Sequence, residues 1–194
     1  MTEARPRHRA VWQAGWHRDA RRLASPNFGP RPEGTVVTLA IVHSISLPPG
    51  VYGGDAIERL FTNRLDAQAH PYYAQLHGVT VSAHFLLRRD GELVQFVGVN
   101  ERAWHAGASN WQGRGNCNDY SVGIELEGLE GQPFEAAQYD ALVALLRQLR
   151  RGWPITEVVG HEHVAPSRKG DPGAGFDWRH LQALLGWPRR CFGG

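Results

Sequence analysis

The clearest signal in the sequence is a series of apolar runs separated by turn-forming residues. Residues 35–43 are rich in β-branched side chains and nearly all apolar, which is typical of a strand covered on both faces. Residues 81–88 and 93–97 predict two strands of a hairpin, because the Asp90-Gly91 pair between them suits a tight turn. Two more apolar runs predict buried strands: residues 121–126 and 158–159.

Helical spacing of apolar residues marks three segments between and after these strands. The first helix is predicted to begin at Asp55, a residue type that caps helices, and to end before His70. The second begins at Pro133, presents one apolar stripe and ends at Gly152, and the third covers residues 177–185. Strands interleaved with helices, plus one hairpin, predict an α/β fold: a single domain with a mixed central β-sheet flanked by helices.

Composition and charge are those of an ordinary globular protein. The 194 residues suffice for one substantial core, and 42% of them are hydrophobic. The net charge is only +2, so nucleic acid is not expected as a partner. No run approaches the roughly 18 to 20 apolar residues of a membrane helix, and no signal-like segment follows the basic start, which predicts a cytoplasmic protein with no membrane association. Two cysteines, Cys117 and Cys191, are too few for a disulfide framework.

Four of the ten histidines lie beside predicted strand ends: His43, His84, His105 and His161. Side chains at strand ends are held by a rigid sheet and face a cleft, so this placement favours a binding site. Taken singly, each histidine is better explained by a structural or surface role than by metal binding. No HExxH pair is present that would identify a metal site from its local spacing.

Residues 160–173 combine two histidines, carboxylates and a lysine with proline and glycine. The pattern is too irregular for a helix or a strand and predicts a shaped loop. From the residues alone, this segment is either a functional loop or a solvated turn in which Asp171 pairs with Arg168 or Lys169.

Six motifs along the chain form an ordered set. They are residues 42–50 (VHSISLPPG), 81–85 (VSAHF), 102–107 (RAWHAG), 117–119 (CND), 123–128 (GIELEG) and the 160–173 loop. Together they resemble the cytosolic 1,6-anhydro-N-acetylmuramyl-L-alanine amidases, a family of the zinc amidase superfamily that also contains phage amidase-lysozymes and peptidoglycan recognition proteins. The resemblance predicts an N-terminal extension over residues 1–24, packed or partly flexible, a zinc amidase domain over 25–188 and a C-terminal tail over 189–194.

The resemblance implies one zinc ion per chain, held by the residues that match His43, His161 and Asp171. Two imidazoles and one carboxylate leave a fourth position for water, as catalytic zinc sites do. His163 is a competing ligand, because alternate residues of a strand point the same way. We prefer His161, which directly follows the glycine of the family motif.

The implied reaction is hydrolysis of the lactyl amide between (1,6-anhydro-)N-acetylmuramic acid and L-alanine of muropeptides in cell-wall recycling, with zinc-bound water as the nucleophile. Glu125 matches the family's general base and acid, and Lys169 matches the residue that stabilises the transition state. Glu127 lies two residues along the same strand, and we interpret it as a solvated or salt-bridged carboxylate. The expected partner is a soluble muropeptide, and the protein is expected to be a monomer.

Aromatic faces stack on pyranose rings and small polar groups fix orientation, which makes five residues candidates for substrate binding. They are Tyr72, His84, Trp104, His105 and Asn118. The sequence departs from the family pattern at Ser44, where asparagine is usual, and near Asn116, where some members have an arginine. The alternative functions are a non-catalytic muropeptide-binding module and a lytic phage-type amidase. The complete set of ligands and the lack of an export signal or wall-binding repeat argue against them.

Overall fold

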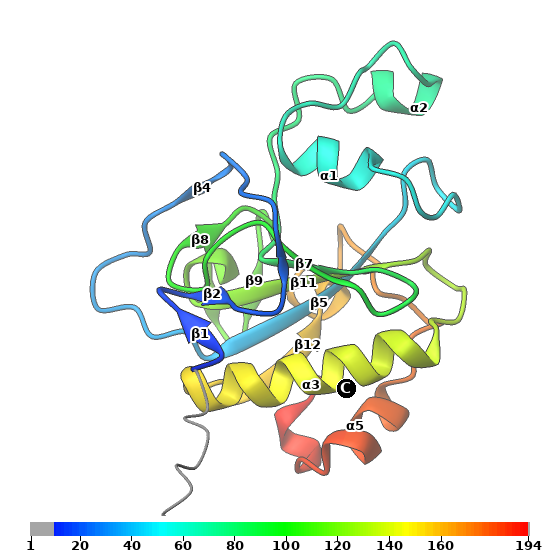
Figure 1. The fold of residues 1–194 in the computed structure, drawn as a ribbon. Helices are drawn as coiled ribbons and strands as arrows, with labels where there is room; N and C mark the ends of the chain where they lie inside the picture. The colour runs from blue at the N-terminus through cyan, green and yellow to red at the C-terminus, as the bar shows by residue number, and fades with distance from the viewer. Residues whose placement is uncertain (1–9, 194) are drawn as a thin grey trace, which may run out of the picture.

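The computed structural model, which describes residues 10–193, is built around a mixed six-stranded sheet (Figure 1). In spatial order its strands are β12 (Glu157–Gly160), β5 (Leu39–Ile45), β11 (Ser121–Glu127), β6 (Phe85–Leu87), β7 (Leu93–Gln95) and β3 (Arg21–Arg22). The four strands from β12 to β6 are parallel, β7 is antiparallel to β6, and β3 is parallel to β7. The predicted α/β fold with a mixed central sheet is confirmed.

Side chains that alternate along the long central strands pack against different layers. Every second apolar residue of β5 and β11 belongs to the largest core cluster, shared with α3 (Ala136–Gly152) and α5 (Trp178–Leu185). Figure 1 shows both helices on one side of the sheet and α1 and α2 on the other. Because successive side chains of a strand point to opposite faces, His43 and Glu125, which are register partners, face away from α3.

The face that carries His43 is covered only in part. One core cluster joins α1 (Ala56–Phe61) to the β6–β7 hairpin, and α2 (Pro71–Ala74) follows nearby in the chain. A third cluster packs the start of β5 against β12 and α4 (His161–Val164). The carboxyl ends of β5 and β11 lie between these clusters, where open α/β sheets place their binding sites.

The hairpin predicted through Asp90-Gly91 is confirmed, with Gly91 at φ 88° and its N–H donating to Arg88 O at 2.9 Å. Both of its strands are shorter than predicted. Before β6, the amides of Ser82 and His84 donate to the carbonyls of Trp104 and Gly123, and only the His84 carbonyl still pairs across the hairpin, with the Phe96 amide at 2.9 Å. The strand predicted over residues 35–43 begins later, at Leu39, and continues to Ile45.

The helices also occur with shifted ends. α1 stops at Phe61, because Asn63 adopts a left-handed φ of 57°. Asp55 precedes the helix, but its side chain accepts a hydrogen bond from Arg59 Nε at 2.7 Å and does not cap the backbone. α3 begins at Ala136 and not at Pro133, since a capping box with Gln138 places the helix start there. α5 agrees with the prediction to one residue.

Residues 10–24 and 189–193 pack on the sheet and its helices. Trp12 of β1 (Trp12–Gln13) contacts Trp153 edge to face with ring centroids 4.9 Å apart, and Phe192 pairs with Val158 of β12. The domain boundaries proposed from the sequence stay predictions. The remaining short elements are β2 (Trp16–His17), β4 (Phe28–Gly29), β8 (Arg102–Ala103), β9 (Asn110–Trp111), β10 (Arg114–Gly115), η1 (Cys117–Asp119) and η2 (Arg189–Cys191).

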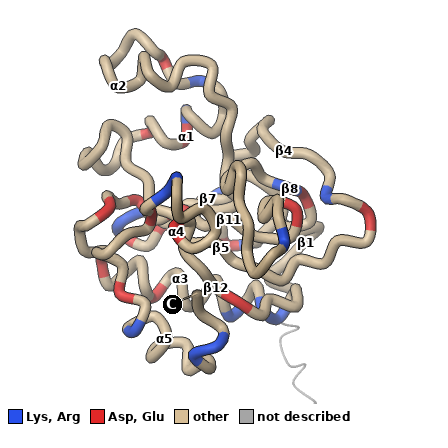
Figure 2. The backbone as a smooth tube through the Cα atoms, turned by 180° about the vertical axis from the view of Figure 1, so that it is seen from behind, with Lys and Arg blue, Asp and Glu red and all other residues tan. Residues whose placement is uncertain are grey.

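The surface carries charges of both signs. Figure 2 shows acidic and basic residues interspersed along the trace. Within residues 10–193, no helix has the length and apolar character needed to cross a membrane. Both cysteines are buried free thiols.

Candidate active site

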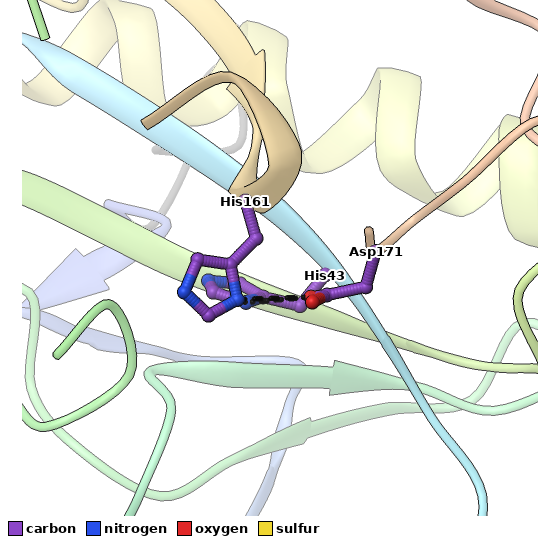
Figure 3. A group of neighbouring side chains, drawn as sticks. All are labelled: His43, His161 and Asp171. Atoms are coloured by element: carbon purple, nitrogen blue, oxygen red, sulfur yellow. Dashed lines mark hydrogen bonds and ion pairs between the residues drawn. The ribbon is translucent and has the colours of Figure 1, made fainter. Parts of the chain in front are cut away.

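Three side chains from separate segments converge at the carboxyl end of β5 (Figure 3). His43 lies on β5, His161 begins α4, and Asp171 lies in the loop that follows. The Nδ1 atoms of the two histidines are 3.0 Å apart, and each is 3.1 Å from Asp171 Oδ2. All three residues are buried. The structure therefore brings the three predicted ligands together, and it forms no other such cluster among residues 10–193.

Hydrogen bonds at the back of the cluster leave ligand atoms facing its centre. His161 Nε2 lies 3.2 Å from Ala106 O, and a carbonyl only accepts, so Nε2 carries the proton and Nδ1 offers a lone pair. Burial raises the pKa of Asp171, but its contacts with His161 and His43 together outweigh burial and hold that pKa well below the usual range. Two acceptors 3.1 Å apart then need a cation or a proton between them. The donor set fits a metal ion.

The imidazole of His43 is also held in the neutral form, which can bind a metal ion. Burial is the main reason that the pKa of His43 falls to about 4, although its hydrogen bond with Asp171 opposes the shift. An uncharged imidazole is the form that ligates metals. Its other nitrogen, Nε2, lies 2.9 Å from His105 Nδ1, away from the cluster.

His163, the competing ligand, does not join the cluster. Its Nδ1 accepts a hydrogen bond from the Gly160 amide at 2.8 Å, and its ring packs against Trp178. Strand alternation does not apply to His161 and His163, because β12 ends at Gly160 and His161 already begins a helix. Two positions along a helix point in different directions. The 160–173 segment therefore contains a short helix and is not wholly a loop.

Glu125 lies beside the cluster on the neighbouring strand. Its Oε2 is buried without a hydrogen-bond partner in the described part of the chain. Burial raises the pKa of Glu125 well above its ordinary value, the charge of Asp171 adds to this rise, and Lys169 opposes it. An unpaired carboxyl with a raised pKa is suited to accept and return a proton near neutral pH.

Lys169 approaches from the loop between α4 and Asp171. It is exposed, and its ammonium group forms no hydrogen bond or ion pair with residues 10–193. It lines the same cavity as Glu125 and the three ligands, with a volume of about 410 Å³. A free cation on this wall can stabilise negative charge that develops on a bound substrate.

Known proteins share both the sequence and the fold. Residues 33–174 match the family model described as N-acetylmuramoyl-L-alanine amidase. The chain belongs to this amidase family. The 1,6-anhydro-N-acetylmuramyl-L-alanine amidase AmpD of Escherichia coli (strain K12) is 49% identical over 175 residues, which cover 89% of this chain and 96% of that protein. The resemblance inferred from the six motifs is thereby confirmed.

Two solved structures extend this comparison. A crystal structure of a selenomethionine AmpD derivative is 48% identical, with a TM-score of 0.87 over 89% of this chain and 98% of that chain. The amidase AmiD from E. coli, solved with the substrate anhydro-N-acetylmuramic acid-L-Ala-D-gamma-Glu-L-Lys, is 30% identical, with a TM-score of 0.57 over 90% of this chain and 65% of that chain. The amidase fold is therefore shared over most of the chain.

The predicted substrate-binding residues of the amidase fall into two groups. Tyr72, Trp104 and His105 lie on the cavity wall. His84 and Asn118 do not, because their polar atoms are engaged behind it. His84 is fully buried and accepts the Gly123 amide at Nδ1, with its Nε2 3.0 Å from Glu101 O.

Glu127, two residues beyond Glu125, is a structural carboxylate. It accepts hydrogen bonds from Arg88 Nη1 at 3.0 Å and from the Gly53 amide at 2.7 Å, and it is buried. The interpretation as a salt-bridged carboxylate is confirmed.

Several cavity residues of the amidase escaped the sequence analysis. Leu60 and Phe61 of α1, Leu47 and Glu130 line the cavity together with the catalytic candidates. Apolar spacing predicted a core-facing side for α1, and no local pattern distinguishes a core position from a cavity wall. Gly123 could have been noticed in the sequence, since a glycine inside a buried strand often marks a place where another group packs closely against the backbone. A Cβ at this position would lie 2.4 Å from His105 Cγ.

Proposed function

We propose that this amidase hydrolyses the lactyl amide between 1,6-anhydro-N-acetylmuramic acid and L-alanine in soluble muropeptides. The observation that carries the proposal is the unpartnered, buried carboxyl of Glu125 beside the converging His43, His161 and Asp171. The name of the E. coli relative AmpD and the substrate bound to AmiD both contain the anhydro sugar joined to L-alanine. The proposed role in cell-wall recycling follows from this substrate.

We assign zinc to the cluster of His43, His161 and Asp171. With bonds of about 2.0–2.1 Å, the ligand atoms of a tetrahedral zinc site lie about 3.3 Å apart, close to the 3.0 to 3.1 Å between the three atoms here. Two imidazoles and one carboxylate also match the composition of catalytic zinc sites. When bound, zinc supplies Lewis acidity that activates water and polarises the amide carbonyl.

Glu125 acts in this proposal as the proton carrier. Its Oε2 accepts a proton from the attacking water and returns it to the alanine nitrogen, which must be protonated before it leaves. A carboxyl held by several hydrogen bonds would be a weaker base, so the lack of a partner at Oε2 supports the role. Lys169 stabilises the negative charge on the carbonyl oxygen, which its free ammonium and its place on the cavity wall support.

In this proposal, aromatic residues that line the cavity bind the substrate. Tyr72 and Trp104 come from different segments and line the same cavity as the three ligands. Their faces suit a pyranose ring, and a cavity of about 410 Å³ is of the size that small ligands occupy. Ser44 also lines the cavity, where its hydroxyl replaces the longer side chain usual in the family.

We further propose that the enzyme works as a monomer in the cytoplasm, with no membrane or nucleic-acid partner. The buried free thiols of Cys117 and Cys191 suit a reducing compartment. Cell fractionation and analytical ultracentrifugation test location and oligomeric state, and a dimer or a membrane-bound pool would contradict the proposal.

The deciding experiment incubates zinc-loaded protein with anhydromuramyl tripeptide and follows peptide release by liquid chromatography and mass spectrometry. We expect release that stops with a chelator and returns with added zinc. Binding without release, at confirmed zinc occupancy, would instead identify a non-catalytic binding module. Clearing of intact sacculi at a rate comparable with that of soluble fragments would identify a lytic amidase.

A further inference from the structure

The two metal-binding histidines share one support behind them. His43 Nε2 lies 2.9 Å from His105 Nδ1, and His161 Nε2 donates to the carbonyl oxygen of the next residue, Ala106, at 3.2 Å. Residues 105–106, here called the brace, therefore contact both rings on the side opposite to the metal-binding atoms. A shift of the brace would rotate both ligands together.

The brace is itself held from two sides. Asn118 Oδ1 accepts hydrogen bonds from both of its backbone amides, at 3.1 Å from His105 N and 2.8 Å from Ala106 N. Arg168 Nη2 donates to Ala106 O at 2.5 Å and to Ala108 O at 3.0 Å. One amide oxygen thus sets the position of two adjacent peptide groups, and a guanidinium from the loop near Asp171 closes the other side.

The ring of His105 is fixed in orientation as well. Its Nε2 lies 3.2 Å from Ser121 Oγ, so both ring nitrogens have partners within the protein. The ring packs flush against Gly123, where even a methyl group would overlap it. A ring with both nitrogens engaged has no free polar atom for a sugar or a peptide, although one edge reaches the cavity wall.

We propose that His105 and Asn118 are positioning residues of the metal centre and not substrate-binding residues. For His43 Nδ1 to give its lone pair to a metal, the proton of this ring must sit on Nε2 and find an acceptor. His105 Nδ1 is that acceptor, and the proton of His105 then lies on Nε2, toward Ser121. Outer contacts of this kind orient metal ligands and typically change metal affinity by about 10- to 100-fold. The inference rests on the proposed function, since it assumes the zinc site.

The test compares two substitutions of His105 in the full-length protein. Asn in His105→Asn places Oδ1 where Nδ1 was and can still accept from His43, whereas His105→Leu fills similar space without an acceptor. Zinc affinity is measured by competition with a chromogenic chelator. We expect His105→Leu to bind zinc about 10- to 100-fold more weakly, and His105→Asn to recover most of that loss. His77→Asn, a substitution at an exposed histidine outside the site, should match the wild type.

Asn118 offers an independent pair if His105→Leu does not fold. Asn118→Asp keeps the accepting Oδ1 and Asn118→Ala removes it, so only the alanine variant should weaken zinc binding. Melting temperatures of the zinc-free variants separate a positioning role from a purely structural one. If Asn118 were purely structural, its removal would lower the melting temperature and leave zinc affinity unchanged. Equal zinc affinity in Asn118→Ala and wild type would overturn the role of Asn118.

Imidazole ¹⁵N spectra of the zinc-loaded wild type test the brace without any substitution. We expect His105 to be neutral with its proton on Nε2. A proton on His105 Nδ1, or wild-type zinc affinity in a folded His105→Leu, would overturn the inference and leave the amidase proposal standing. A wild type that binds no zinc would instead refute the metal centre itself, and with it the brace.

Discussion

Two neighbouring regions on the open face of β11 hold the same side chain in opposite surroundings. At one, Glu127 accepts hydrogen bonds from Arg88 and from the Gly53 amide, and Arg88 also binds Glu58 at 2.5 Å. At the other, two residues away, Glu125 keeps an unpartnered Oε2 beside the converging metal ligands. The first carboxylate joins segments of the fold, whereas the second is left free to exchange a proton.

The difference shows what distinguishes a structural carboxylate from a reactive one. Both residues are buried, so burial alone does not separate them. Donors separate them, because Glu127 accepts hydrogen bonds from an arginine and from a backbone amide. Glu125 lacks such donors, and burial raises the pKa of Glu125. A buried carboxyl without a hydrogen-bond partner needs an explanation, and the metal ligands beside Glu125 favour a functional one.

The largest effect should come from removing the anionic ligand of the reactive region. In Asp171→Ala we expect zinc and activity to be lost together, with a fall in zinc affinity beyond the roughly 100-fold that loss of a supporting contact produces. Metal analysis and peptide release measure both. Asp177→Ala, which removes the helix-capping carboxylate of α5, should keep zinc. Normal zinc content in Asp171→Ala would assign the ligand to another residue.

The substitution Glu125→Gln tests whether the unpartnered glutamate is the general base. The amide has nearly the same shape but is not a base, so kcat should fall by about 10²- to 10⁴-fold while zinc content stays unchanged. Steady-state kinetics with anhydromuramyl tripeptide and metal analysis provide the two readouts. A kcat within tenfold of the wild type would remove Glu125 from the mechanism.

Glu127→Gln is the matched substitution in the structural region. We expect kcat to remain within a few-fold of the wild type and the free energy of unfolding to fall by about 3 kcal/mol, because Arg88 loses a buried anionic partner. Urea unfolding of the zinc-loaded protein measures the change. An unaltered unfolding midpoint combined with a large loss of kcat would exchange the roles of the two glutamates.

The smallest effect is a pH-dependent difference in stability between zinc-free wild type and zinc-free Glu125→Gln. The pKa of Glu125 is higher in the folded state than in the unfolded state, where it is near 4.5. Protonated Glu125 therefore stabilises the fold fully at a pH below 4.5, and this contribution to the free energy of unfolding is lost as the pH rises through the pKa of the folded state. Glutamine does not ionise. The variant should therefore melt at a higher temperature than the wild type at neutral pH, and the gap should close toward pH 4.5; a gap independent of pH would contradict the raised pKa.

Much of the fold follows from local patterns. The apolar runs of β5 and β11 and the Asp90-Gly91 turn all appear where the sequence predicts them. The ends of elements differ because tertiary hydrogen bonds compete with local ones. The amides of residues 82 and 84, for example, donate to carbonyls outside the hairpin, those of Trp104 and Gly123.

The metal ligands and the catalytic glutamate of the candidate site were predictable from the sequence, whereas the roles of the residues around them were not. The metal cluster and Glu125 stand at positions of recognisable motifs, and the structure brings them together. The placement of His84 and Asn118 behind the cavity wall was not predictable, since a polar residue near a motif looks the same whether it faces substrate or backbone. His163 was ambiguous until the end of β12 was known.

By itself, the sequence determined the strand period that puts Glu125 and Glu127 on one face, because side-chain direction in a strand depends only on local backbone geometry. Only the tertiary structure decided which of the two is paired. The donors to Glu127 come from Arg88 and Gly53, which are 39 and 74 residues away along the chain. Whether a buried charge is satisfied depends on such distant partners, and no local pattern of residues contains them.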